Sequence, residues 1–395
     1  MGPALLTRLM AHLRDRLNYG LFHFHCSKDE RPSLAIFDDF VPNITTAFRI
    51  AEFNFYLRSF SGSVVYSWYP DFSSHHKVYS QLYPDLKGRV KPFSVQRIPD
   101  MSLAYCVFLN NAYSITPLLA KRRTPFVFTL YPGGGFGLEE DESDKKLECV
   151  FATGLVRKLI VTQTITREYI EKKGWHRNCE VEFVYGAVIH DSYFNTDMPP
   201  KEQYQVNKDT FDICFVADKY MPFGLNKGYD LFLTSAKVLR RELGDARFHI
   251  VGGFDRNDFD VSGLGDSVIF YGRRDTNYLR DFFSRMDMIV SPNIPFKLHP
   301  GNFDGFPTAS CVEASLCSVA MVCTDILRLN THYKDGIDIC LIEPNVNDIV
   351  QKALYFHNNP EHLYRVARNG MEVSRLLFNP EIQMSKRHKV LSKLI

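Results

Sequence analysis

The sequence predicts two α/β domains, each built on a parallel β-sheet. Short apolar, β-branched and aromatic runs alternate with amphipathic helical stretches in both halves of the 395-residue chain. Parallel strands joined by crossover helices produce this alternation, because such strands are buried on both faces of the sheet. The length is also too great for one hydrophobic core and suits two domains.

The first domain is expected over residues 1–194. Its strands should be short β-branched or aromatic runs bounded by polar or proline-containing segments. Such runs lie at residues 34–40, 63–69, 103–110, 125–131 and 158–163. The clearest helical patterns between them are at 47–60 and 165–174.

The second domain is expected over residues 210–375, after a linker at 195–209. The linker has few apolar residues and carries the pair Pro199-Pro200, a composition typical of interdomain connections. A helix is expected at 229–243, and strands at 211–217, 247–253, 267–272, 288–293, 318–325 and 339–344. Residues 376–395 are expected to form a C-terminal helix, which can pack back on the first domain.

Charge and cysteine usage exclude several classes of protein. Lysine plus arginine number 47 against 45 acidic residues, so no overall field favours nucleic acid as a partner. The nine cysteines are an odd number without a CxxC pair, and several lie in apolar runs. This usage indicates reduced thiols and a cytoplasmic location. No apolar run approaches the roughly 20 residues needed to span a bilayer.

The N-terminus allows peripheral contact with a membrane. One helical face there gathers six apolar residues, Leu5, Leu6, Leu9, Met10, Leu13 and Leu17. Arginines lie elsewhere on the same helix, and a basic amphipathic helix can lie on the anionic cytoplasmic face of a membrane. The other interpretation is a helix that packs on its own domain, or a loose leader.

The segment 301–325 carries the most informative chemical pattern. A loop with Asp304 and Gly305 leads into a helix expected to begin near Thr308, with Glu313 about one turn inside it. Free backbone N–H groups and the helix dipole favour a diphosphate at such a helix start. Glu313 could accept hydrogen bonds from a ribose diol, and Asp304 could hold hydroxyls of a transferred sugar. The alternative is an N-capped helix of any α/β protein.

A second segment, 215–233, places Lys227 at the start of another helix. The order strand, loop, Lys227-Gly228 and helix would project the lysine into a cleft, where it would neutralise a pyrophosphate leaving group. Two facing parallel sheets place their ligand in the cleft, beyond the carboxyl ends of the strands. The alternative is a surface lysine near a helix N-terminus.

Together these segments resemble the retaining glycosyltransferases of family four, which have the GT-B fold. The family pattern E-G-F-x-x-x-x-x-E-A, followed by C-G-x-P-V-V-x-T-D, is similar to Asp304-Gly305-Phe306 through Glu313-Ala314 and on to Thr324-Asp325. The family's K-G-x-x-x-L-L is similar to Lys227-Gly228 through Leu233. The resemblance extends from about residue 103 to 375 and is strongest after Phe211.

The resemblance implies transfer of a sugar from a nucleotide-sugar donor to a glycan or lipid-linked acceptor, with retention of configuration and without a metal or other cofactor. It implies catalytic roles for Asp304, Lys227 and Glu313. On the donor side it implies that the nucleotide-sugar is bound by Lys219, Gly305, Phe306, Pro307, Thr308, Ala309 and Ser310. His299, just before this loop, is also expected to lie on the donor side of the cleft. The sequence departs from the pattern in several ways. The first acidic position is Asp304 rather than Glu, and the spacing from Asp304 to Glu313 is one residue longer than usual. Asp218 stands where many members have an arginine, for which Lys219 is the expected substitute.

Two loops of the first domain are expected to face the acceptor or the sugar. Consecutive glycines permit unusual backbone angles and the close approach of a ligand, and one loop contains Tyr131, Gly133, Gly134 and Gly135. Tyr131 stands where family members often have a histidine. The other loop follows the first strand and supplies Asp38, Asp39 and Arg49. The acidic run 139–144 is expected to be a solvated loop.

Other interpretations stay open. A nucleotide-sugar epimerase on the same fold would turn over donor without an acceptor. A non-catalytic protein would bind a nucleotide-sugar or a glycan without transfer. The sequence Asp258-Phe259-Asp260 is the metal signature of a different glycosyltransferase fold, but its place between βα units predicts a surface loop, and no metal site is expected.

Overall fold

The computed structural model describes residues 32–39, 47–195 and 197–395. The amphipathic helix expected between Leu5 and Leu17 lies outside the described residues. Within the described ranges, no helix combines the length and the apolar character needed to cross a bilayer.

The first half of the chain forms a seven-stranded parallel sheet in the order β3-β2-β1-β4-β5-β6-β7. Its strands are β1 (Leu34–Asp38), β2 (Ser63–Ser67), β3 (Val90–Pro92), β4 (Leu103–Val107), β5 (Phe126–Leu130), β6 (Val156–Val161) and β7 (Glu180–Phe183). Strands β1, β4 and β5 are buried along their whole length. This explains why they are continuous apolar and aromatic runs rather than alternating ones.

The second half forms a six-stranded parallel sheet in the order β10-β9-β8-β11-β12-β13. Its strands are β8 (Phe211–Val216), β9 (Ala246–Val251), β10 (Val268–Phe270), β11 (Met288–Ser291), β12 (Ala320–Thr324) and β13 (Cys340–Ile342). Counted from its own first strand, this is the 3-2-1-4-5-6 order of a doubly wound nucleotide-binding sheet.

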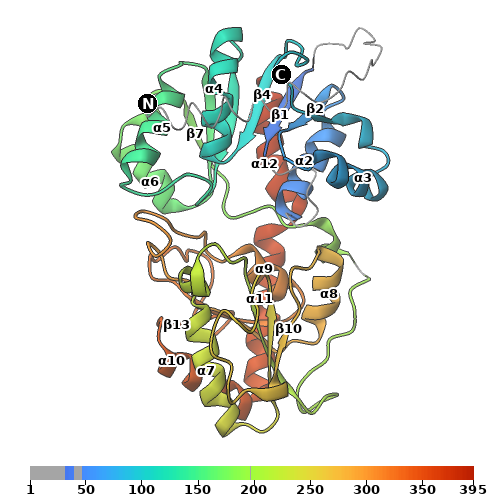
Figure 1. Ribbon diagram of the computed structural model, residues 1–395, viewed down its shortest axis with the longest axis vertical. Helices are drawn as coiled ribbons and strands as arrows, with labels where there is room; N and C mark the ends of the chain where they lie inside the picture. The colour runs from blue at the N-terminus through green and yellow to red at the C-terminus, as the bar shows by residue number, and fades with distance from the viewer. Residues whose placement is uncertain (1–31, 40–46, 196) are drawn as a thin grey trace. The chain divides into compact units, whose positions relative to one another are not determined.

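Helices connect the parallel strands and cover the sheets (Figure 1). In the first half they are α2 (Ala47–Ser59), α3 (Phe72–Leu82), α4 (Leu109–Arg122), α5 (Asp141–Phe151) and α6 (Thr164–Lys172). In the second half they are α7 (Tyr229–Glu242), α8 (Thr276–Ser284), α9 (Ala309–Leu316), α10 (Val346–Asn358) and α11 (Pro360–Phe378), followed by α12 (Pro380–Ser392).

The predicted fold class, two parallel-sheet α/β domains, is confirmed. The sequence did not indicate α3 or β3: β3 is a three-residue edge strand that contains a proline. The acidic run 139–144 is not a simple solvated loop, because Asp141, Glu142 and Asp144 form the first turn of α5. Carboxylates are favoured there by the helix dipole.

The C-terminal helix α12 packs against α2 of the first sheet, and Figure 1 shows the two side by side. The contact buries Arg387 completely. Its guanidinium donates to the Tyr131 hydroxyl at 3.1 Å and lies 3.9 Å from the Glu52 carboxylate, which is itself fully buried. The chain thus returns to its first half after completing the second sheet.

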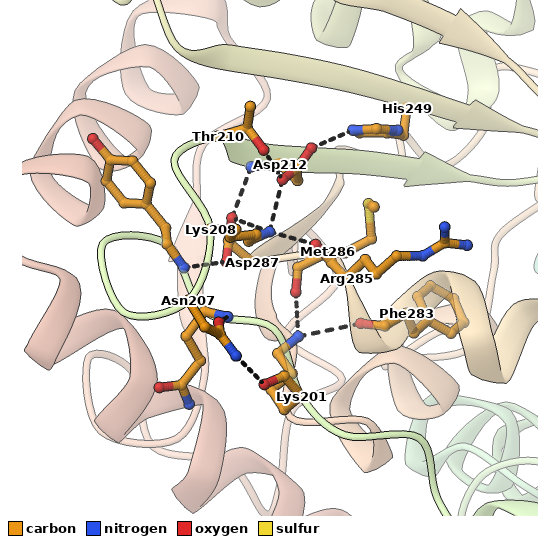
Figure 2. Close-up of polar contacts among 12 residues, drawn as sticks. Lys201, Asn207, Lys208, Thr210, Asp212, His249, Phe283, Arg285, Met286 and Asp287 are labelled. Atoms are coloured by element: carbon orange, nitrogen blue, oxygen red, sulfur yellow. Dashed lines mark hydrogen bonds and ion pairs between the residues drawn. The ribbon is translucent and has the colours of Figure 1, made fainter.

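Residues 201–212 attach the connection between the two sheets to the amino ends of the second sheet's strands (Figure 2). The Lys208 ammonium pairs with Asp212 at 2.7 Å and with Asp287 at 2.9 Å, and all three side chains are nearly buried. Burial opposes ionisation, but hydrogen bonding from His249 and the charge of Lys208 hold the pKa of Asp212 well below its usual value. The lysine therefore compensates two buried carboxylates at once.

Replacing Lys208 by methionine should destabilise the protein strongly. The change leaves Asp212 and Asp287 buried without their cation, which typically costs about 3–5 kcal/mol of the free energy of unfolding. Lys237→Met is the matched control, since it breaks an ion pair with an Asp260 carboxylate that is mostly exposed, and such pairs contribute about 1 kcal/mol or less. Urea denaturation of both variants measures the difference. Equal losses of unfolding free energy in the two variants would show that the buried Lys208 cluster contributes no more stability than an exposed ion pair.

Candidate functional site

The fold places the site at the carboxyl end of the second sheet. In a doubly wound sheet the ligand crevice lies where the strand order reverses, here between β8 and β11. The connection after β8 runs through residues 217–228, and the connection after β11 runs through 292–308. Both segments identified from the sequence therefore arrive at the same edge.

Close backbone packing fixes the position of Lys227. Gly228, which follows it, has a left-handed φ of +66°, and a Cβ there would lie 2.1 Å from the Pro292 carbonyl oxygen. The Asn226 carbonyl accepts a hydrogen bond from the Ile294 N–H at 3.0 Å. The two connections are thus held together, and only glycine fits at position 228.

The Lys227 ammonium forms an ion pair with Asp304 at 2.7 Å. The lysine side chain is 10% exposed and the aspartate 35% exposed, so the cation is largely desolvated while its partner opens to solvent. A cation in such surroundings attracts an anion more strongly than one in bulk water. The structure therefore joins the two charged residues that the sequence singled out from separate motifs.

A pocket with an empty volume of about 430 Å³, open solvent included, lies beside this pair. The predicted residues that line it are Asp304, Gly305, Phe306 and Thr308. The sequence analysis did not assign the others, which include Ser291, Asn293, Thr324 and Asp325 at the ends of β11 and β12. Position after a parallel strand was the signal that could have found them.

Helix α9 starts at the edge of this pocket. Thr308 occupies the N-cap position, and its side chain does not cap the helix. Ala309 and Ser310 form the first turn and are half-buried, whereas Pro307 is buried and lies outside the pocket lining. The backbone N–H groups of this first turn can serve an anion.

Glu313 lies apart from the residues that line the pocket. The Glu313 side chain is buried. Burial raises the pKa of Glu313 to about 8, against an opposing effect of the neighbouring Tyr193 phenol. The carboxyl group is therefore predominantly protonated at neutral pH in this state.

Side chains of the first sheet hold the 304–306 loop. The Tyr185 hydroxyl donates to the Phe306 carbonyl oxygen at 2.9 Å, and the Phe306 N–H donates to Gln163 Oε1 at 3.4 Å. A Cβ at Gly305 would lie 3.0 Å from Gln163 Nε2. Gln163 and Tyr185 follow β6 and β7, so the carboxyl edge of the first sheet meets the pocket loop.

The triple-glycine loop makes a second contact between the two halves. Gly134 and Gly135 have positive φ, and a Cβ at either position would collide with the Phe108 or Asn110 side chain. The glycines are thus needed for packing on the start of α4. Beyond them, the Leu138 N–H donates to the Gly301 carbonyl oxygen at 2.8 Å.

His299 lies at the same contact. Its Nδ1 is 3.2 Å from a Glu140 carboxylate oxygen, and its ring is partly exposed. Gly301 allows the approach, because a Cβ there would lie 2.2 Å from the Leu138 carbonyl oxygen. His299 belongs to the bridge between the two halves and not to the pocket lining.

Tyr131 points into the first domain and not toward the pocket. The side chain is buried, and its hydroxyl contacts Arg387 at 3.1 Å and Glu52 at 3.3 Å. Burial raises the pKa of the phenol far above its usual value. In this state Tyr131 anchors the start of the glycine loop to the interior of the first domain.

Asp38, Asp39 and Arg49 do come together. Arg49 Nη1 lies 2.9 Å from Asp38 and 3.0 Å from Asp39, and the Asn111 amide donates to both carboxylates at 3.2 Å. This cluster follows β1 beside β4, where the strand order of the first sheet reverses. It therefore occupies the equivalent switch point of the first domain.

Lys219 is engaged outside the pocket. It pairs with Asp258 at 2.7 Å, while Asp260 pairs with Lys237 on α7. The two carboxylates of the Asp258-Phe259-Asp260 sequence are thus held by different lysines. Within the described residues, no group of three or more histidines, cysteines and carboxylates is arranged to hold a metal ion.

A protein-family model matches the part of the chain that contains this site. Residues 210–359 match the family model described as "Glycosyl transferases group 1". The match covers the second sheet with Lys227, Asp304 and α9. No curated protein sequence matches the chain.

Solved glycosyltransferase structures share the whole two-sheet fold. HepE of Anabaena in complex with UDP is 13% identical, with a TM-score of 0.68 over 91% of this chain and 100% of that chain. Sucrose-phosphate synthase from Thermosynechococcus elongatus is 14% identical, with a TM-score of 0.61 over 92% and 100%. A glycosyltransferase from Rickettsia africae is 13% identical, with a TM-score of 0.61 over 92% and 99%. The fold is therefore GT-B.

Glu313→Gln should stabilise the protein in a pH-dependent way. The folded state keeps the Glu313 proton up to about pH 8, whereas the unfolded state loses it near pH 4.5. Each unit of pH increase between these two values therefore lowers the unfolding free energy of the wild type by about 1.4 kcal/mol. Glutamine carries no such proton. The variant should therefore gain stability over the wild type from pH 5 to pH 8, as measured by urea denaturation. Glu361→Gln, at an exposed position of α11, is the control, and a pH-independent difference would contradict the assignment.

Proposed function

We propose that the protein is a glycosyltransferase that moves a sugar from a nucleotide-sugar, most simply a UDP-sugar, to a glycan or lipid-linked acceptor with retention of configuration. The observation that carries the proposal is the Lys227–Asp304 pair beside a pocket at the start of α9. A cation and free N–H groups suit a diphosphate, and a half-exposed carboxylate suits sugar hydroxyls. The matched family and the GT-B neighbours support the same reaction class.

Each group has a defined role in this proposal. Lys227 and the first turn of α9 would stabilise the departing nucleoside diphosphate, which carries the developing negative charge. Asp304 would orient the transferred sugar. The acceptor hydroxyl would attack from the same face of the sugar and give its proton to a leaving phosphate oxygen. Orientation and charge stabilisation would then supply the rate without a protein nucleophile, a metal or another cofactor.

The nucleotide is assigned to UDP by analogy. HepE structures contain UDP, UDP with glucose, or UDP-glucose, and a TarM structure contains UDP with a glycan and a glycosylated glycerol. These are properties of those proteins, and they guide the choice of ligand here. A cytoplasmic location, with peripheral contact at the membrane face for a lipid-linked acceptor, completes the proposal.

Thermal stability in the presence of nucleotides tests donor binding. At 100 times its dissociation constant, a UDP-sugar should raise the free energy of unfolding by about 2.7 kcal/mol and shift the midpoint visibly. Lys227→Ala should weaken binding by roughly 10- to 150-fold, the typical value of a hydrogen bond to a charged group. Lys237→Ala, on the exposed face of α7, is the control. No shift with any nucleotide would refute the proposal, and donor turnover without an acceptor would indicate an epimerase.

Asp304→Asn should separate nucleotide binding from transfer. Removing a negative charge 2.7 Å from Lys227 frees the ammonium for phosphate, so UDP should bind about three- to tenfold more tightly. Sugar transfer should fall at least tenfold, because the orienting carboxylate is lost. Titration calorimetry with UDP and initial transfer rates give the two values. Weaker UDP binding with unchanged transfer would contradict the roles given to this pair, and Asp258→Asn serves as the control.

A further inference from the structure

Tyr220 is an exposed aromatic residue next to Lys227. Solvent reaches 61% of its side chain, yet its ring lies 5.4 Å from the Lys227 ammonium. Single exposed aromatics are ordinary on protein surfaces. Tyr220 differs because its ring lies beside the Lys227 ammonium while water still reaches it.

The backbone around Tyr220 is held firmly. Phe223 and Gly224 both have a left-handed φ of 58°, and a Cβ at Gly224 would lie 2.5 Å from the Phe254 ring. The buried Tyr229 ring packs on Phe254 with centroids 4.4 Å apart. A tight turn over an aromatic core therefore connects Tyr220 to Lys227.

The Tyr220 hydroxyl makes no hydrogen bond to any residue in the described part of the chain. Buried tyrosines nearby behave differently, since Tyr185 and Tyr204 both donate to protein oxygens. The Tyr220 ring is thus exposed beside Lys227, and its hydroxyl is open to solvent. These are features of a residue that meets a ligand.

We propose that Tyr220 is a specificity-determining residue that binds the pyranose ring of the donor sugar. This inference rests on the proposed function. The sugar is attached to the phosphate that Lys227 would hold, so it must lie within a few ångströms of a ring next to that ammonium. The C–H groups of a pyranose can pack on the negative face of an aromatic ring, and the free hydroxyl can hydrogen-bond a sugar hydroxyl.

The alternative ligand for the ring is the nucleobase, and binding data distinguish the two. If Tyr220 contacts the sugar, Tyr220→Ala should leave the dissociation constant of UDP within about twofold of the wild-type value. The same change should weaken the UDP-sugar by roughly 3- to 10-fold, the usual value of an aromatic contact. Tyr220→Phe should recover most of this loss, because the ring remains.

Titration calorimetry with UDP and with UDP-glucose, UDP-galactose or UDP-N-acetylglucosamine, whichever binds the wild type most tightly, provides the test. Tyr355→Ala is the matched control, because Tyr355 is 48% exposed on α10 and its ring packs on Phe356 and His362 rather than on Lys227. Selective loss of UDP-sugar affinity would support the proposal. Equal weakening of UDP and UDP-sugar, or no change in either, would overturn the role of Tyr220 alone. A wild-type protein that binds no UDP compound and no other nucleoside diphosphate or nucleotide-sugar would overturn the proposed function with it.

Discussion

The ion pair between Lys227 and Asp304 joins two connections that leave the second sheet after different strands. Residues 217–228 follow β8 and residues 292–308 follow β11, and they meet because these strands are neighbours at the point where the strand order reverses. Gly228 permits the close approach of the two backbones. The pocket, the start of α9 and the position of Tyr220 all depend on this meeting. If the two connections did not meet here, Lys227 and Asp304 would lie apart and the candidate site would not form.

The two edges of the second sheet carry their buried charge in different ways. At the amino edge, Lys208 compensates Asp212 and Asp287 within a nearly dry cluster, and the connection from the first sheet is fixed there. At the carboxyl edge, the Asp304 partner of Lys227 stays open to solvent. A closed network favours rigidity, because removing one member leaves an uncompensated charge. An open pair can exchange its partner for a ligand at a smaller cost.

The fold was predictable from the sequence because strands buried on both faces appear as continuous apolar runs. The same runs gave the ends of the strands, and hence the loops that hold Lys227 and Asp304. Tyr131 is a residue whose place could not be predicted from the sequence. Its position after β5 suggested the cleft, but its hydroxyl contacts the buried Arg387 of α12 in the interior of the first domain. That partner lies more than 250 residues later in the chain. Tyr220 was missed for the opposite reason. An aromatic residue in a polar loop carries no periodic signal, and only the folded turn shows which charges surround it.

The charges around the pocket also explain how an anion can be held without the arginine that the family pattern places after β8. Four basic side chains are held in ion pairs: Lys227 with Asp304, Lys219 with Asp258, Arg273 with Asp218, and Arg49 with Asp38 and Asp39. Helix α9 is different, because Thr308 does not cap it and its first N–H groups keep their positive potential. Backbone N–H groups have fixed directions, so they recognise the geometry of a phosphate as well as its charge. In the proposed function, the diphosphate therefore depends on the path of the 304–308 loop as well as on Lys227, and Gln163 and Tyr185 of the first sheet hold that path in place.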